Sequence, residues 1–412
     1  MTARSDALRA GVERLSQPAG ILILVSTAHA ITHVYAALFP LVYPSIQQEW
    51  GLSYTAIGTM VGLTSFIGGS LQLLFGFIGR SFPRNVVLGL GNLLFGITTA
   101  LTGVSANFTQ FAALRFGGAV ANAAQHPVGN SLIADRFPRE RRGSALAVNF
   151  AGGNLGTLAV PLIAVALIGT LGWRQALWAF AVPGIVMGGI LMFAMDDRDR
   201  ARDRIQGHGS GIAQLGRILR NRNVLALVGA SSVAAAGRGL GVLLTIIPLY
   251  LSNVLGLAPW IVGMLYTIML VGSVVGPMAA GRLSDRVGRK LVLVGALVLA
   301  TIVTLALPAF HEGGVAVLAV VLFLMGAFAF AESPLVQTFA ADSVAAGERD
   351  ILFGFYYAWV FAVGAGWIAL IAALIDRVGF EPVWGLIAAS YLASALLILL
   401  ARETRRGAAQ TA

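Results

Sequence analysis

The sequence of 412 residues contains no cysteine, and charged residues make up only 11% of it. Without cysteine the chain has no disulfide framework, no thiolate metal ligand and no cysteine nucleophile. Soluble domains carry roughly 25% charged residues, so this chain has too little charge to cover a water-facing surface. Hydrophobic residues account for 57%. The composition therefore excludes a soluble enzyme and a disordered protein, and it predicts a protein with several membrane spans.

Long apolar runs fill most of the sequence. A helix that crosses a bilayer needs about 20 mostly apolar residues, and we find twelve such stretches. They lie at 20–46, 54–79, 86–105, 108–134, 144–168, 175–195, 224–254, 259–281, 291–310, 314–341, 352–375 and 383–401. We therefore expect an all-α membrane protein. The polar residues 1–20 do not have the pattern of a cleavable signal, and no phosphate-binding loop of an ATP-driven pump is present.

The 28 lysines and arginines lie almost entirely in alternate connections between the predicted spans. The opposite connections hold only Arg174 and Arg377, while Arg115 and Arg238 fall inside spans. Because short loops rich in Lys and Arg stay in the cytoplasm, we expect both termini there and the chain in the cytoplasmic (inner) membrane of the cell. The net charge of +10 then reports topology, and no nucleic-acid partner is implied.

The two halves of the chain resemble each other. Gly51-Leu52 recurs as Gly256-Leu257, and Gln125-His126-Pro127 recurs at the matching place as Glu332-Ser333-Pro334. Parallel repeats of six spans, related by an axis along the membrane normal, are a transporter architecture whose binding site lies near the bilayer midplane. We therefore expect two pseudo-symmetric bundles of six helices.

The longest connection, 196–222, would separate a bundle at 1–195 from a bundle at 223–412. Its apolar residues between Ile212 and Leu219 recur at helical spacing beside basic residues. This pattern fits a short helix that lies on the cytoplasmic face of the membrane. A plain linker is the alternative.

A ten-residue polar loop at 281–290 reads Gly-Arg-Leu-Ser-Asp-Arg-Val-Gly-Arg-Lys. It resembles, in full, the signature loop of the major facilitator superfamily (Gly-x-x-x-Asp-Arg-x-Gly-Arg-Lys). The equivalent loop at 76–85 keeps the first glycine but has Arg80 where the signature has aspartate. The resemblance covers nearly the whole chain and implies a secondary active transporter that works by alternating access.

The resemblance also implies a conformational latch made by Gly281, Asp285, Arg286 and Arg289. The resemblance implies that Asp285 faces the start of span eleven, near Ile351. A carboxylate at a helix N-terminus gains roughly 0.3–1 kcal/mol. The arginines would add charge-assisted hydrogen bonds. Such a latch would close the cytoplasmic side, and a plain cytoplasmic loop is the alternative.

Within the superfamily, four segments are similar to the fosmidomycin-resistance-type exporters. They are Gly51-Leu52-Ser53-Tyr54, Gln72 with Phe75-Gly76, His126-Pro127-x-Gly129 and Gly153-Asn154-Leu155-Gly156. This narrower resemblance is the only basis for expecting export. The glycine-rich last segment is interpreted as a surface for close helix packing.

Ionisable residues inside the spans are few, and such residues mark transport pathways by default. His33 lies near the middle of span one, with His29 one turn away on the same helix face. Arg238 occupies the equivalent position in span seven. We expect these residues to contact the substrate. The alternative is an arginine permanently paired with protein groups and a histidine bonded to a neighbouring helix.

Two prolines, Pro127 and Pro334, lie at equivalent places inside spans four and ten, where each can distort its helix. Gln125 and His126 lie beside the first proline and are further candidates for substrate contact, with simple helix bending as the alternative. Glu332 lies beside the second proline and is the only carboxylate clearly inside a span. It is therefore the candidate proton carrier, and the alternatives are a static partner of Arg238 and a helix-packing contact.

Arg115, in the outer third of span four, resembles the span-four arginine of superfamily drug–proton antiporters, which implies a role in proton coupling. A structural arginine is the alternative. Because in-span cations outnumber in-span carboxylates, we expect an anionic or amphiphilic substrate. The sequence thus predicts a monomeric, non-enzymatic transporter in the lipid bilayer that exports a small organic compound in exchange for protons, without metal or cofactor. Uptake or exchange of an organic anion without proton coupling, and a non-transporting membrane sensor, are the alternatives.

Overall fold

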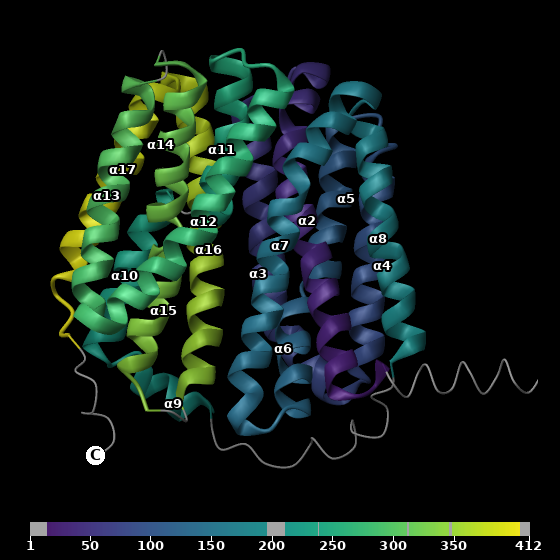
Figure 1. Ribbon diagram of the computed structural model, residues 1–412, viewed down its shortest axis with the longest axis vertical. Coiled ribbons are helices and arrows are strands. Elements are labelled where there is room, and N and C mark those ends of the chain that lie inside the picture. The colour runs from purple at the N-terminus through teal and green to yellow at the C-terminus, as the bar shows by residue number, and fades with distance from the viewer. Residues whose placement is uncertain (1–14, 196–210, 238, 311–312, 346–347, 404–412) are drawn as a thin grey trace, which may run out of the picture. The chain divides into compact units, whose positions relative to one another are not determined.

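The computed structural model describes residues 15–195, 211–237, 239–310, 313–345 and 348–403 (Figure 1). Helices contain nearly all of these residues, and none of them lies in a strand. The contacts between helices divide the chain into two units. They are Met1–Trp50 with Ile67–Gly207, and Gly51–Phe66 with His208–Ala412. The predicted all-α fold is confirmed.

The first unit is built from the helices of the N-terminal half. They are α2 (Pro18–Trp50), the second part of α3 (Tyr54–Ser81), α4 (Arg84–Thr102), α5 (Phe108–Asn122), α6 (Gln125–Arg136), α7 (Arg139–Leu171) and α8 (Trp173–Ala194). Within it α2 packs along α7, and α4 packs along α8 (Figure 1). Helices suit a membrane because every backbone N–H and C=O group within a helix can form a hydrogen bond inside the same segment.

The second unit contains the first part of α3 and the helices of the C-terminal half. They are α9 (Gly211–Ile218), α10 (Arg222–Ala234), η2 (Ala235–Gly237), η3 (Gly239–Leu243), α11 (Leu244–Leu249), η4 (Tyr250–Val254), α12 (Pro259–Val287), α13 (Arg289–Ala309), α14 (Gly314–Ala329), α15 (Glu332–Asp342), α16 (Arg349–Val378) and α17 (Phe380–Ile398). The elements η3 and η4 are π-helical turns, which occur often at functional sites.

Among the described residues, eleven helical segments are long and apolar enough to cross a membrane. The predicted span that is not among them is the fourth, which the structure forms from α5 and α6. These helices are separated by Ala123 and Ala124, and α6 carries polar residues such as His126 and Asn130. The equally interrupted tenth span, Gly314–Asp342, is apolar enough to be among the eleven, so the fourth span differs by its polar residues although it occupies the predicted positions.

The internal repeat is visible in the backbone. Gly51 and Gly256, at equivalent places in the two halves, both have φ of 60°. Gly172 and Gly379, which precede the last long helix of each half, have φ of 95° and 78°. Residues with a side chain rarely adopt such angles, so glycine is required at these turns. The two halves therefore share turn geometry as well as sequence pattern.

Both halves also break one span at the same place. Helix α6 begins at Gln125 and α15 begins at Glu332, and each has its proline, Pro127 or Pro334, in the first turn. Proline is tolerated there because backbone N–H groups of a first turn have no partner within the helix. At each predicted distortion the helix is interrupted for two residues, and a polar half-helix follows.

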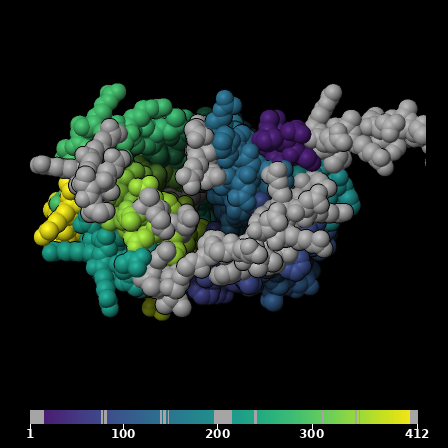
Figure 2. Space-filling model, turned by 90° about the horizontal axis from the view of Figure 1, so that it is seen from below, coloured from purple at the N-terminus to yellow at the C-terminus, as the bar shows by residue number. Residues whose placement is uncertain are grey.

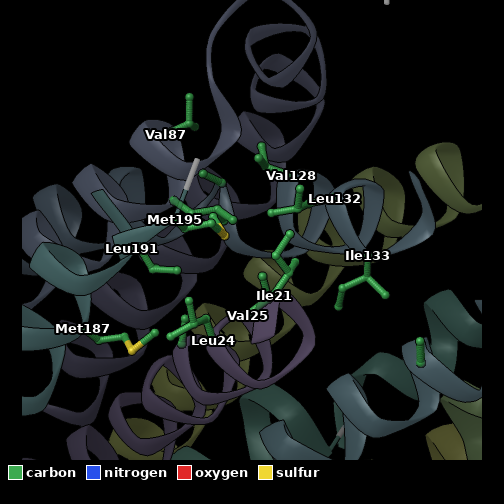
Figure 3. Close-up of a cluster of buried hydrophobic side chains, with 14 residues drawn as sticks. Ile21, Leu24, Val25, Val87, Val128, Leu132, Ile133, Met187, Leu191 and Met195 are labelled. Carbon is green, nitrogen blue, oxygen red and sulfur yellow. The ribbon is translucent and has the colours of Figure 1, made fainter. Parts of the chain in front are cut away.

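A cluster of buried apolar side chains fixes α2 against α6 in the first unit. Ile21 and Val25 of α2 lie beside Val128 and Leu132 of α6, with further side chains from α4 and α8 (Figure 3). His29 follows Val25 by one turn and therefore lies on the same face of α2. The packing that holds the two helices together thus determines how closely His29 approaches the start of α6.

The predicted helix in the long connection is confirmed as α9, and the alternative of a plain linker is wrong there. Ile218 is buried, and the Nε atom of Arg217 lies 2.7 Å from Glu348 just before α16. In the view from below, teal residues lie beside light-green residues of the second unit, as expected for the contact of α9 with α16 (Figure 2). Residues 196–210 lie outside the described residues, and the contact of α9 with a membrane stays a prediction.

Candidate functional site

Three histidine side chains gather in the first unit, two from α2 and one from the first turn of α6. The ring centroids of His29 and His33 lie 4.7 Å apart, those of His29 and His126 lie 5.0 Å apart, and those of His33 and His126 lie 6.2 Å apart. One ring nitrogen from each lies within 4.8 Å of the others. The structure thus brings together three of the residues predicted to contact substrate.

The tautomer of His29 follows from its hydrogen bond. Its Nδ1 atom lies 2.8 Å from the main-chain oxygen of Asn149 on α7. A carbonyl oxygen can only accept, so the proton is on Nδ1, and Nε2 of the neutral ring carries a lone pair. This Nε2 atom is buried and has no hydrogen-bond partner among the described residues.

The same reasoning assigns His33. Its Nδ1 atom lies 3.0 Å from the hydroxyl oxygen of Thr157, and that hydroxyl donates its single hydrogen to the Gly153 carbonyl at 3.2 Å. The hydroxyl must therefore accept from Nδ1 of His33. The lone pair of the neutral His33 ring is again on Nε2.

Gly153 of α7 provides the space beside these two nitrogens. A Cβ atom built on Gly153 would lie 3.1 Å from Nε2 of His29 and 3.1 Å from Nε2 of His33. Both distances are shorter than ordinary van der Waals contacts. The glycine therefore leaves room beside the Nε2 atoms of both rings, a role beyond the helix packing that the sequence suggested.

Gln125 lies in the same unit but bonds elsewhere. Its amide nitrogen donates to the main-chain oxygen of Val25 at 3.4 Å, and its oxygen accepts from Asn92 at 3.2 Å. It lines a small pocket together with Thr32, Asn92 and Asn122. Its hydrogen bonds thus connect α6 to α2 and α4, and its predicted contact with substrate stays a prediction.

Arg115 lies among aromatic residues of α2. Its guanidinium carbon lies 3.4 Å from the centre of the Phe39 ring, and its side chain hydrogen-bonds the hydroxyl of Tyr43. Cation–π contacts of this kind stabilise a desolvated arginine. The contacts favour the structural alternative, and a role in proton coupling stays a prediction.

Glu332 is 3% exposed and is the first residue of α15 in the second unit. The start of a helix favours negative charge. Nearby, Ser333 lies 3.5 Å from the hydroxyl of Tyr356 and accepts from Gln337 at 3.0 Å, which links α15 to α16. Arg238 lies outside the described residues, so its predicted contacts stay predictions.

The predicted latch loop forms an ion network within the second unit. Arg289 lies 2.7 Å from Asp285 and 3.1 Å from Asp342 at the end of α15. Glu403 accepts from the first two main-chain N–H groups of α13 at 2.9 and 3.0 Å. Arg286 is exposed, and a Cβ on Gly281 would meet only open space. The predicted approach of Asp285 to the start of α16 stays a prediction.

Two polar contacts were not anticipated from the sequence. Arg84, 1% exposed, forms an ion pair of 2.9 Å with Asp135, which repeats the Arg289–Asp342 pair in the first half. Asp376 of α16 accepts from the main-chain N–H groups of Tyr54 and Thr55 at 2.9 and 2.7 Å. The internal repeat is a signal for the Arg84–Asp135 pair, because the equivalent residues in the second half, Arg289 and Asp342, have the same charges. No pattern in the sequence connects Asp376 with the start of α3.

Eleven apolar helical segments in the described part of the chain, a six-span repeat and polar residues gathered at helix interruptions define a helical membrane protein with transporter architecture. A family model described as Major Facilitator Superfamily matches residues 25–264 and 230–412. The chain belongs to this superfamily of transporters, and the resemblance of its signature loop is thereby confirmed.

Individual relatives agree with this assignment. The chain is 24% identical to the fosmidomycin resistance protein of Escherichia coli (strain K12) over 388 residues, 92% of each chain. It is 30% identical to the "Probable L-galactonate transporter" of the same strain over 167 residues, which are 40% of this chain and 37% of that protein. The crystal structure of a D-xylose–proton symporter superposes with a TM-score of 0.74 at 18% identity, over 93% of this chain and 98% of that one. This last likeness concerns the fold alone.

Proposed function

We propose that the chain is a proton-coupled secondary transporter that exports a small organic anion. The superfamily assignment and the six-span repeat support alternating access between two bundles. The observation that carries the proposal is the burial of Glu332 at the break between α14 and α15.

Glu332 is suited to carry the coupling proton. It is the only carboxylate among the buried residues that the structure describes. Its equivalent in the first half, Gln125, has the shape of a protonated glutamate but cannot ionise. At this pair of equivalent positions, only the residue of the second half can therefore alternate between a charged and a neutral side chain. Since a charge inside a membrane is costly, the two protonation states would favour different conformations, as coupling requires.

The proposal that the substrate is an anion rests on the balance of charged residues inside the spans. Two arginines, Arg115 and Arg238, stand against the single carboxylate Glu332 there, and a substrate of opposite sign would complement them. One relative is named a probable L-galactonate transporter, and L-galactonate is a carboxylate anion. The likeness to the fosmidomycin resistance protein along 92% of the chain supports export.

The proposal is tested with the purified chain in proteoliposomes that carry an imposed pH gradient. A panel of labelled organic anions would begin with L-galactonate, and D-xylose would serve as the uncharged comparison. We expect one or more anions to move against their own gradient when protons flow the opposite way, and D-xylose to stay in equilibrium. Equal anion transport with and without the gradient would support uptake or exchange without coupling. Transport of no anion would contradict the proposal.

A further inference from the structure

We propose that His29, His33 and His126 bind a divalent transition-metal ion within the first unit, with one coordination position left open. This inference goes beyond the proposed transport activity and departs from the sequence prediction that no metal is bound. The cluster draws its ligands from two helices, α2 and α6, and is supported by a third, α7.

The hydrogen bonds of the cluster prepare two of the rings as ligands. Metal-binding histidines almost always donate their second ring N–H to a carbonyl, carboxylate or water, which fixes the ring and exposes the other nitrogen. His29 donates from Nδ1 to the Asn149 carbonyl, and His33 donates from Nδ1 to Thr157. In both rings Nε2 is the free ligand atom.

The space and the angles between the rings also fit an ion. Gly153 leaves open the region that both Nε2 atoms approach. The three rings are nearly perpendicular to one another, at 80° to 88°, so their lone pairs can come from different directions. Zinc–nitrogen bonds of 2.0–2.1 Å place tetrahedral ligand atoms about 3.4 Å apart. The present separations of up to 4.8 Å would close by small rotations of the rings.

The chemistry of the cluster selects the kind of cation. Imidazole nitrogen suits zinc, cobalt, nickel and copper, whereas calcium and magnesium require oxygen ligands. Buried lone pairs without a partner are costly, and Nε2 of His29 is one of these among the described residues. A metal ion would satisfy the lone pairs of the cluster at once.

The bound ion would keep its charge and an open position. The ligands in the cluster are all neutral imidazoles, so the site would carry a charge of about +2. Three protein ligands with a free fourth position are the arrangement of catalytic zinc sites, where water or substrate completes the coordination. A carboxylate could occupy this position, although metal binding itself does not depend on the identity of any transported substrate.

The first experiment is metal binding by the purified full-length chain, carrying an affinity tag without histidine and stripped with a chelator. Cobalt(II) is titrated while the visible absorption of tetrahedral cobalt is recorded, and bound zinc is counted by elemental analysis. We expect one ion per chain. Because the chain has no cysteine, thiolate coordination cannot contribute to the signal. A wild-type chain that binds neither ion would overturn the proposal without any variant.

Variants then locate the site. H29A, H33A and H126A should each lower the affinity for cobalt at least about tenfold, as loss of a ligand or its support does. H208A and H311A, which replace the other two histidines of the chain, are the matched controls and should bind as the wild type does. Unchanged affinity in the first three variants, or lost binding in the controls, would contradict the assignment.

A supporting residue provides a test in which all three ligands stay in place. Thr157→Val removes the hydroxyl that orients His33 but keeps the shape of the side chain, and it should weaken cobalt binding about 10- to 100-fold. Thr157→Ser restores the hydroxyl and should recover most of the affinity. Equal affinity in Thr157→Val and the wild type would show that the bond to His33 does not prepare a metal ligand.

Discussion

Arg84 and Asp135 form an ion pair of 2.9 Å in the first unit, and their equivalents Arg289 and Asp342 form one of 3.1 Å in the second. The two pairs connect the same two helices of each half, α4 with α6 and α13 with α15. Their surroundings differ. Arg84 is 1% exposed, whereas Arg289 is 16% exposed and also contacts Asp285. The repeat therefore preserves the contact but not its environment.

This difference predicts unequal effects on stability. Asp135→Asn leaves the buried Arg84 without this carboxylate, whereas Asp342→Asn leaves Arg289 with Asp285. Because removal of one partner from a buried ion pair is costly, Asp135→Asn should lower the free energy of unfolding by roughly 1–3 kcal/mol, and Asp342→Asn, at the more exposed pair, should lower it less. Thermal unfolding of the purified variants in detergent measures the order. Equal losses, or a larger loss for Asp342→Asn, would contradict this view of the two pairs.

Asp376 should control fraying at the start of α3. Its carboxylate accepts from the main-chain N–H groups of Tyr54 and Thr55, and removal of a capping side chain costs about 0.5–2 kcal/mol. Asp376→Ala should therefore speed hydrogen exchange in the peptide that contains Tyr54 and Thr55. Glu381→Ala, which removes an exposed carboxylate from the first turn of α17, is the control. If the rate of hydrogen exchange in this peptide is the same in both variants, Asp376 does not have this role.

The space beside Gly153 should be necessary for the metal site. Gly153→Ala places a methyl group about 3 Å from Nε2 of His29 and His33 without removing a ligand, and we expect cobalt affinity to fall at least about tenfold. Gly169 lies on the same helix with open space around it, so Gly169→Ala should bind cobalt as the wild type does. If Gly153→Ala binds cobalt as tightly as the wild type does, Nε2 of His29 and Nε2 of His33 do not bind a metal ion beside Gly153.

The sequence predicts those parts of the fold that depend on local pattern. Apolar length determines the spans, Pro127 and Pro334 determine where two of them break, and glycines such as Gly51 and Gly256 determine turns. These features act over a few residues, so they can be read from a single chain.

The contacts of the site are harder to predict because they depend on the rotation of one helix about its axis against another. His29 and His33 are recognisable as a polar face of α2, but no pattern identifies Asn149 and Thr157 of α7 as their partners. The same limit hides the contact of Asp376 with α3, since its partners lie far apart in the chain.

The most direct test of the account compares Glu332→Gln with the wild type in proteoliposomes under an imposed pH gradient, using an anion that the wild type transports. Glutamine has the shape of protonated glutamate and cannot release a proton. We therefore expect Glu332→Gln to lose gradient-driven net transport while it still exchanges labelled for unlabelled anion across the membrane. Glu381→Gln, the same change at an exposed position, should behave as the wild type does. Full gradient-driven transport by Glu332→Gln would contradict the account.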